Sequence, residues 1–234
     1  MSTTSFFNFT FLPKYWTMFV QGIEYTLLLS VCAVLLAIIP AMLLAILRLS
    51  KNKVVRFLSG LYIDVFRATP LLVQLSLIYF GLFNFFRLPT VYIFGFINIA
   101  MFVPGVVALS LNSAAYVAEI FRAGILAVDA GQTEAARSLG LSSSAAMFMV
   151  VLPQAVKNVL PALANELITM VKESSICSML GMMELMWAAK TVAATTYITL
   201  GPYVVAAMIY FCINYPASKI IEAIERRMRR GDQR

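Results

Sequence analysis

Long runs without a charged side chain divide the 234-residue sequence. Four of these runs extend from Thr26 to Leu47, from Ala68 to Phe86, from Leu88 to Ala118 and from Thr191 to Ser218. A helix needs about 20 residues to cross the roughly 30 Å hydrocarbon layer of a membrane. Each run is long enough for one crossing, so the pattern predicts a chain of membrane-spanning helices.

We predict five spanning helices in a single transmembrane domain that covers residues 1–234. They extend from Trp16 to Leu47, Phe57 to Phe86, Ile99 to Phe121, Ala155 to Met179 and Ile198 to Ile221. The second helix is expected to break at Thr69–Pro70, because proline removes a backbone donor and disfavours helix at the residue before it. The first apolar run lacks the flanks of a cleaved signal peptide, so we expect it to be a retained span. The fold class is therefore an all-α membrane protein.

Basic residues are unevenly distributed between the two sides of the predicted bundle. One side holds Arg48, Lys51, Lys53, Arg56 and the tail residues Arg226, Arg227, Arg229, Arg230 and Arg234, and the other holds Lys14, Arg87 and Lys190. Loops rich in Lys and Arg stay in the cytoplasm. The N-terminus is therefore expected outside and the C-terminus in the cytoplasm. The net charge of +7 reflects this bias rather than a nucleic-acid-binding surface.

Composition narrows the classes of function. Hydrophobic residues make up 61% of the chain and charged residues only 12%, about half of what a soluble domain carries. Histidine is absent, which excludes a histidine-based active site or proton relay. Cys32, Cys177 and Cys212 lie in apolar segments, and their number and spacing predict neither a disulfide framework nor a metal site.

The segment from about 127 to 156, between the third and fourth predicted spans, is polar at its start but has helical character. Residues 133–139 are mostly good helix formers, and Gly140 suits a left-handed cap at the end of that helix. Ser142 to Ser144 can begin a second helix, which is expected to end before Pro153. The sequence predicts two short helices that meet at a glycine corner on the cytoplasmic side. A plain hairpin is the alternative, but about 30 residues is long for a bare connection.

Several strings in the sequence resemble the EAA-motif family of ABC importer permeases, in its polar amino acid branch. Within this segment they are Glu134-Ala135-Ala136, Gly140, Leu152-Pro153 and Pro161, and elsewhere residues 66–74, 115–122, 131–132, 152–155 and 172–175. They occur in the family's order, and the resemblance covers the chain from about Tyr25 to Arg227. It implies a type I importer permease fold.

The resemblance also implies how the chain works. Glu134, Ala135, Ala136 and Gly140 would form the coupling helix that docks on separate ATP-hydrolysing subunits. The chain itself has no G-x-x-x-x-G-K-[ST] phosphate loop, so no cofactor is expected on it, and ATP and magnesium would bind the partner ATPase. Further implied partners are a second permease subunit, an extracytoplasmic binding protein, a polar amino acid and the lipid bilayer. The implied location is the bacterial cytoplasmic membrane.

Polar groups on three predicted spans form a candidate substrate site. They lie at similar depth: Arg67 with Thr69, Asn112 with Ser113, and Glu166 with Thr169. Arg67 and Glu166 are each about 15 Å from the cytoplasmic end of their helices, at 1.5 Å per residue. Charged residues inside spans usually mark a pathway. Arg67 could meet the carboxylate of an amino acid, and Glu166 its ammonium group.

Other interpretations are open at this point. Asp64 and Arg67 lie three residues apart, and we favour a structural ion pair between them over a ligand site. Three further functions would also suit an apolar chain: an ion-driven secondary transporter, a scaffold or sensor subunit, and a membrane enzyme. The sequence shows no inverted repeat, charge relay or nucleophile–base pair to favour them.

Overall fold

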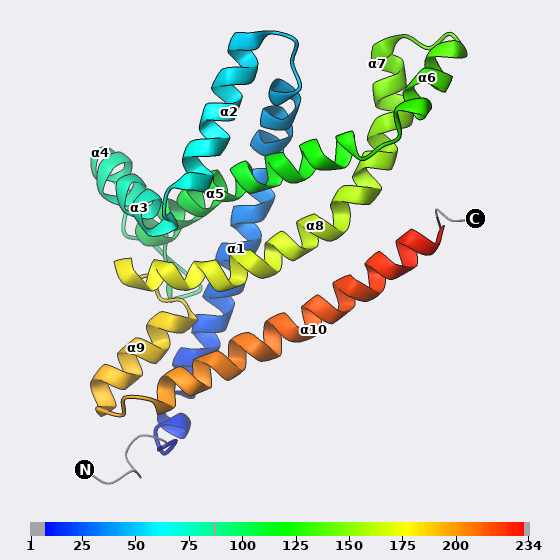
Figure 1. The fold of residues 1–234 in the computed structure, drawn as a ribbon. Coiled ribbons are helices and arrows are strands. Elements are labelled where there is room, and N and C mark those ends of the chain that lie inside the picture. The colour runs from blue at the N-terminus through cyan, green and yellow to red at the C-terminus, as the bar shows by residue number, and fades with distance from the viewer. Residues whose placement is uncertain (1–7, 87, 232–234) are drawn as a thin grey trace.

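The computed structural model of the chain describes residues 8–86 and 88–231, most of which lie in helices (Figure 1). Helix α1, Leu12–Arg48, packs along α5, Ile99–Leu126. The contact between them includes buried alanines, namely Ala37, Ala41 and Ala45 of α1 and Ala114 and Ala118 of α5. Small side chains let membrane helices approach closely, so this pair forms a tight centre for the bundle.

The second predicted span consists of two helical arms. Helix α2, Lys53–Ala68, ends where Thr69 adopts an extended conformation, with φ −108° and ψ 145°. The second arm comprises α3, Leu71–Ser76, the π-helix η2, Leu77–Leu82, and α4, Phe83–Phe85. The arms are bent by 106° relative to each other. The predicted break at Thr69–Pro70 is confirmed, and it divides the predicted span from Phe57 to Phe86 into these two arms.

A short β-hairpin leads from the second arm into α5. Strand β1, Tyr92–Ile93, pairs antiparallel with β2, Ile97–Asn98. The turn between them contains Phe94 and Gly95, both with positive φ, as tight hairpin turns require. The hairpin lies in the connection between the second and third predicted spans, and the predicted all-α class of membrane protein is confirmed by the predominance of helix.

The segment between α5 and the fourth span contains the predicted glycine corner. Helix α6, Ala130–Ser138, is followed by Gly140 with φ +87° and by α7, Ser143–Ala146, whose first turn is capped by Ser142. The expected end of the second helix before Pro153 was wrong. The chain instead passes through the π-helix η3, Met147–Val151, into α8, Leu152–Glu173, and the 3₁₀ helix η4, Ser174–Leu180. Pro153 is tolerated because it directly follows the π-helix, where the regular α-helical hydrogen-bond pattern is already interrupted.

The last part of the chain holds one helix more than predicted. Helix α9, Leu185–Thr196, contacts α1, and α10, Gly201–Gly231, runs beside α8 (Figure 1). The buried carboxylate of Glu184 begins α9 by accepting hydrogen bonds from the backbone N–H groups of Met186 and Trp187, at 2.8 and 2.7 Å. Tyr210 of α10 donates a third, at 2.9 Å. Glu184 thereby joins α9 to α10.

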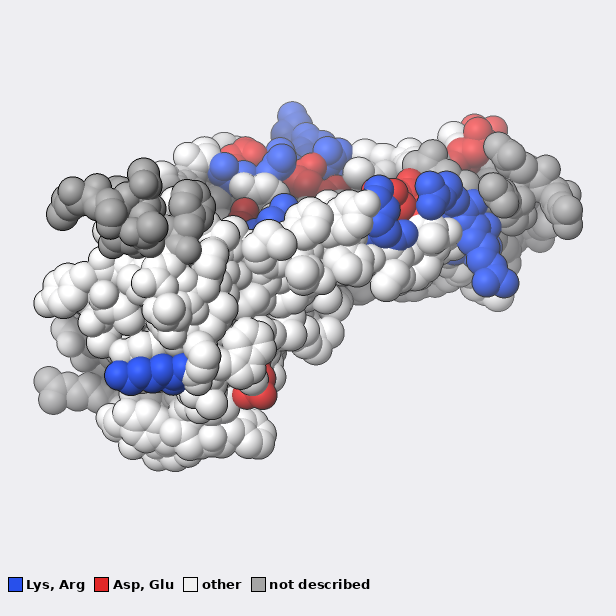
Figure 2. Space-filling view, turned by 90° about the horizontal axis from the view of Figure 1, so that it is seen from below, with Lys and Arg blue, Asp and Glu red and all other residues white. Residues whose placement is uncertain are grey.

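Four helical stretches in the described part of the chain are long and apolar enough to cross a membrane, and the bent α2–α3 pair brings the number to five. This agrees with the five predicted spans. Large parts of the face shown in Figure 2 carry no charged side chain, in keeping with the apolar composition of the spans. The orientation of the chain stays a prediction. Of the basic residues behind it, Arg87 and Arg234 and the side chains of Arg229 and Arg230 lie outside the described residues.

Candidate functional site

Five polar side chains from three spans make two sets of hydrogen bonds that adjoin on α5, and together they are here called the polar cluster. Its members are Thr69, Gln74, Asn112, Ser113 and Glu166. Four of them were predicted from the sequence. All but Thr69 are buried. Buried polar groups need partners, and the cluster supplies them across helices that are far apart in the sequence.

Gln74 holds the broken span in its bent shape. Its side-chain nitrogen donates to the backbone oxygen of Phe66 at 2.7 Å, and to the backbone and hydroxyl oxygens of Thr69 at 3.0 and 2.8 Å. Its side-chain oxygen accepts a hydrogen bond of 2.8 Å from Asn112 of α5. Backbone groups freed by Pro70 thus find a partner inside the protein, as a membrane interior requires.

Gln74 was not singled out from the sequence. The available signal was a lone amide in the apolar run that follows Pro70, within the string of residues 66–74 already noted for its resemblance. Its role depends on Asn112, 38 positions along the chain. Helix periodicity relates only neighbouring positions of one helix, so it does not reveal such a partner.

Glu166 of α8 lies on the other side of α5. The hydroxyl of Ser113 donates a hydrogen bond of 2.8 Å to its Oε1 atom. The side chain is only 9% exposed, and Oε2 makes no hydrogen bond to any described residue. No cation among the described residues forms an ion pair with it. A buried carboxylate with one open oxygen can accept a hydrogen bond from a positively charged ligand.

Arg67 and Thr169, the other predicted site residues, lie outside these contacts. The exposed guanidinium of Arg67 lies over the ring of Tyr116, 5.5 Å from its centroid. The favoured ion pair between Arg67 and Asp64 does not form in the described part of the chain. Thr169 donates to the backbone oxygen of Asn165, at 3.2 Å, on its own helix. The structure therefore leaves the charge of Arg67 available to a ligand.

A cavity of about 920 Å³ lies between α8 and α10, and its lining includes Asn165, the residue that precedes Glu166. Polar side chains contribute much of its lining, among them Asn158, Asn165, Ser218 and Glu222. A polar lining between two membrane helices suits a water-filled space rather than lipid. The cavity extends from the level of Asn165 toward the C-terminal end of α10, where Met228 lines it.

The glycine corner has a defined backbone geometry. Gly140 N–H donates to the backbone oxygen of Arg137 at 3.0 Å, and Leu141 N–H donates to that of Ala136 at 3.2 Å. This pair of bonds is the Schellman motif, which requires a left-handed residue at Gly140. The predicted left-handed cap is confirmed.

The side chains of α6 divide into an outer and an inner face. Glu134 and Ala135 are exposed, whereas Ala136 is buried against the rest of its own chain. Of the predicted coupling residues on α6, Glu134 and Ala135 are therefore open to a partner, whereas Ala136 packs inward. Leu139, just before the corner, is 85% exposed. A large apolar side chain this exposed at a protruding tip is suited to a pocket on a partner.

The fold, the polar cluster and the glycine corner together define a class of protein. The polar cluster lies among membrane-spanning helices, a polar cavity lies between α8 and α10, and a helical corner protrudes from one end (Figure 1). The described residues hold no group of three or more metal-ligating side chains. Such a molecule is a membrane transport component that offers a path and a docking surface.

The comparisons with known proteins name the family. Residues 33–230 match the model described as the binding-protein-dependent transport system inner membrane component, and the chain belongs to this family. It is the permease component of an ABC importer, whose ATPase is a separate subunit. The predicted resemblance to the amino acid branch is also confirmed by the relatives.

Two relatives cover nearly the whole chain. The "Putative glutamine transport system permease protein GlnP" of Rickettsia conorii is 44% identical over 218 residues, which are 93% of this chain and 95% of that protein. The arginine transport system permease protein ArtQ of Bacillus subtilis is 40% identical over 91% of this chain and 93% of its own length.

Solved structures support the same fold. An amino acid ABC transporter crystallised with histidines has a chain that is 44% identical to this one, with a TM-score of 0.84 over 97% of this chain and all of that one. An inward-facing MetNI methionine ABC transporter is 20% identical, with a TM-score of 0.69 over 91% of this chain and 98% of its own. The second match shows the shared type I importer fold alone.

Proposed function

We propose that this chain carries a polar amino acid through the bacterial cytoplasmic membrane and that Glu166 contacts the positively charged group of that amino acid. One observation supports the proposal above the others: Glu166 is buried and accepts a hydrogen bond from Ser113, while its second oxygen has no partner among the described residues. An uncompensated buried carboxylate is costly, so a transport protein keeps one where a ligand can satisfy it.

The same arrangement suggests which residues would bind the other groups of the amino acid. Arg67 carries a positive charge that no described carboxylate neutralises, and it would receive the carboxylate of the amino acid. Asn112, Thr69 and Thr169 would add hydrogen bonds around the path. A second positive charge on the side chain, as in arginine, lysine or histidine, suits Glu166. An uncharged side chain is also compatible, because the α-ammonium group alone can meet this carboxylate.

The proposed complex places this chain among three kinds of partner. ATPase subunits, which bind the ATP and magnesium, would receive the corner around Glu134, Ala135 and Gly140. A second permease subunit would complete the path, since five spans are few to enclose one. An extracytoplasmic binding protein would deliver the amino acid to the outer side. We place the N-terminus outside and the C-terminus in the cytoplasm.

Glu166→Gln tests the site directly. The substitution keeps the shape and the acceptor for Ser113 but removes the negative charge. We expect uptake of the amino acid to fall by about tenfold or more, because hydrogen bonds to charged groups contribute roughly 1.5–3 kcal/mol. The ATPase should still copurify with the variant. Uptake is measured in proteoliposomes with a radiolabelled amino acid and its binding protein.

The matched control is Glu24→Gln, which removes a carboxylate from α1, a different span. This variant should leave uptake near the wild-type rate. Wild-type uptake by the Glu166→Gln complex would remove Glu166 from the site. The identity of the amino acid is tested separately, by titrating the partner binding protein with a panel of cationic and neutral polar amino acids.

A further inference from the structure

An apolar cavity of about 510 Å³ lies beside the C-terminal ends of α1 and α5. Residues from α1, α5 and the η3–α8 region surround it, among them Met42, Ile46, Phe121, Met147, Leu152 and Val156. Several of these side chains, including Ile46 and Val156, are exposed although they are apolar. In a membrane protein such a cavity is filled by hydrocarbon, because water gains nothing from its walls.

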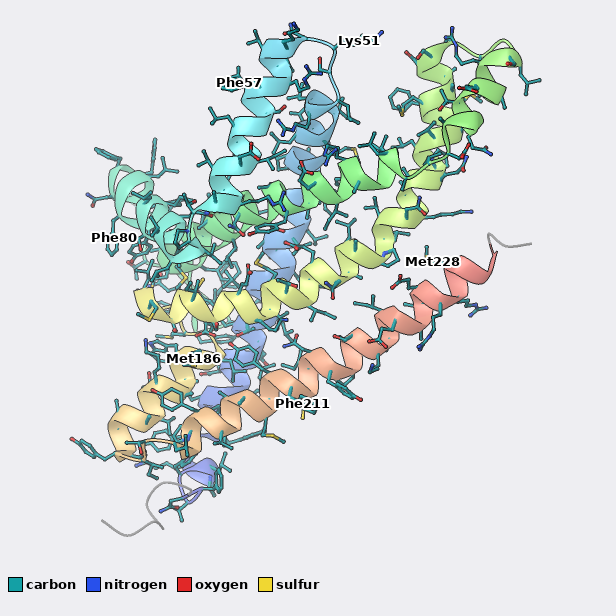
Figure 3. All side chains as sticks on the ribbon, viewed as in Figure 1. Lys51, Phe57, Phe80, Met186, Phe211 and Met228 are labelled. Atoms are coloured by element: carbon teal, nitrogen blue, oxygen red, sulfur yellow. The ribbon has the colours of Figure 1, made fainter. Side chains whose placement is uncertain are left out.

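A second cavity, of about 590 Å³, lies next to the first and is strongly basic. It is lined by Arg48, Leu49, Lys53, Arg56, Phe57 and Arg122. Leu49 lines both cavities, so the two adjoin at the end of α1. Figure 3 shows this end of the molecule, where Lys51 and Phe57 mark the α1–α2 connection and the start of α2.

The charges in the basic cavity are largely uncompensated. Arg122 forms an ion pair of 2.8 Å with Glu119. Within the described part of the chain, neither Arg48, Lys53 nor Arg56 forms an ion pair with a carboxylate. Arg48 is held in place, because it donates to the backbone oxygen of Arg56 at 3.3 Å and its guanidinium packs on Gly60. Three cations therefore line one cavity, and none of them is paired with a described carboxylate.

We propose that the two adjoining cavities bind one anionic phospholipid, with its phosphate among Arg48, Lys53 and Arg56 and an acyl chain in the apolar cavity. The connection between α1 and α2 joins two membrane-spanning segments, so the basic cavity lies at the membrane surface, where headgroups are found. Arg and Lys bind phosphate oxygens through charge-assisted hydrogen bonds. A role as topology anchors explains basic residues in this loop, but it does not account for an apolar cavity that opens beside them.

The test uses the full-length chain in complex with its ATPase, purified in a mild detergent and depleted of lipid. Phosphatidylglycerol is added, and retained lipid is counted by native mass spectrometry. The wild-type complex should retain it in preference to phosphatidylcholine. Lys53→Gln with Arg56→Gln should weaken retention by about tenfold or more, because two cations near a headgroup are lost. The matched control, Arg226→Gln with Arg227→Gln on exposed α10, should retain the lipid as the wild type does.

Two further measurements distinguish recognition of the lipid headgroup from recognition of the acyl chain. Val156→Trp places a large side chain in the apolar cavity and should reduce retention of phosphatidylglycerol while Arg48, Lys53 and Arg56 stay intact. Glycerol phosphate, a headgroup without acyl chains, should not displace the retained lipid at equal concentration. Equal retention by the wild type and the Lys53/Arg56 variant would overturn the proposal. Displacement by glycerol phosphate would overturn it too, since the site would then recognise a free phosphate.

Discussion

At the scale of single residues, Gln74 and Glu184 have the same structural role, because each side chain binds backbone groups where a regular helix is interrupted or begins. Gln74 satisfies the backbone where the second span breaks, and Glu184 satisfies the backbone where α9 begins. Each also reaches a neighbouring helix, through Asn112 and Tyr210 respectively. Irregular backbone inside a membrane protein thus depends on individual polar side chains that bind it from within.

Glu184 gives a prediction about pH. It lies between the fourth and fifth spans, and burial raises the pKa of its carboxyl group from 4.5 to about 7, although its three hydrogen bonds oppose the shift. The folded state therefore favours the protonated form. The stabilising contribution of this group is complete below about pH 4.5 and is lost as the pH rises through about 7. We expect the thermal unfolding midpoint in detergent to fall over that range.

Glu184→Gln should reduce this pH dependence. The amide stays neutral at every pH, but it leaves one helix-capping donor without an acceptor, so the variant should lose about 1 kcal/mol of stability at low pH. Glu134→Gln, on the exposed face of α6, removes a carboxylate without disturbing this contact and serves as the control. An unchanged slope of midpoint against pH in Glu184→Gln would show that another group titrates.

At the scale of elements, the glycine corner between α6 and α7 is the proposed site at which transport is coupled to ATP hydrolysis. Gly140 has φ +87° and open space around its Cα, so a larger side chain there is strained by its backbone conformation rather than by a clash. Left-handed conformations cost most residues roughly 1–2 kcal/mol. We expect Gly140→Leu to displace α6 and abolish the ATP hydrolysis that accompanies transport, measured with the purified complex and its binding protein.

Gly140→Asn separates backbone conformation from side-chain size. Asparagine tolerates the left-handed region better than leucine does, so this variant should keep much of the stimulated ATP hydrolysis. If ATP hydrolysis by the Gly140→Leu complex is stimulated as strongly as that of the wild type, the corner is not the site of coupling. Stimulation lost in both variants would mean that any side chain at this position blocks the docking surface.

The elements also show which parts of the fold the sequence could predict. Local signals were sufficient for the long apolar helices, for the break at Thr69–Pro70 and for the left-handed Gly140. The features that were missed depend on distant contacts. The π-helix at Met147–Val151 was read as a helix end, and α9 is capped by Glu184, which no periodicity marks. In the polar cluster, Ser113 and Glu166 were predicted by depth alone, whereas their hydrogen bond needed the crossing of α5 and α8.

At the scale of the whole molecule, the spans differ in how much of their surface the chain itself covers. α5 is the most buried of the candidate spans and α10 the least. The polar cavity borders α10, so covering that helix would also enclose the cavity. The proposed second permease subunit would cover this helix.

The orientation of the whole chain can be tested with fusions. The basic residues that follow α1 and end α10 predict a cytoplasmic C-terminus. Alkaline phosphatase, which is active only outside the cytoplasm, should be inactive when fused to the C-terminus and active when fused within the hairpin loop near Phe94. A fluorescent protein should give the reverse result. Phosphatase activity at the C-terminus would show that the bundle is inverted.

The π-helix at Met147–Val151 lies between the corner at Gly140 and α8. A π turn needs one residue more than an α turn to complete a revolution, so the surplus residue is absorbed within the turn. Deleting one residue here would let the stretch close as an α turn, and we expect the corner to keep nearly the same direction around the axis of α8. Deleting one residue from the regular part of α8 would instead rotate the corner by about 100° relative to the spans. This stretch can therefore gain or lose one residue without turning the corner.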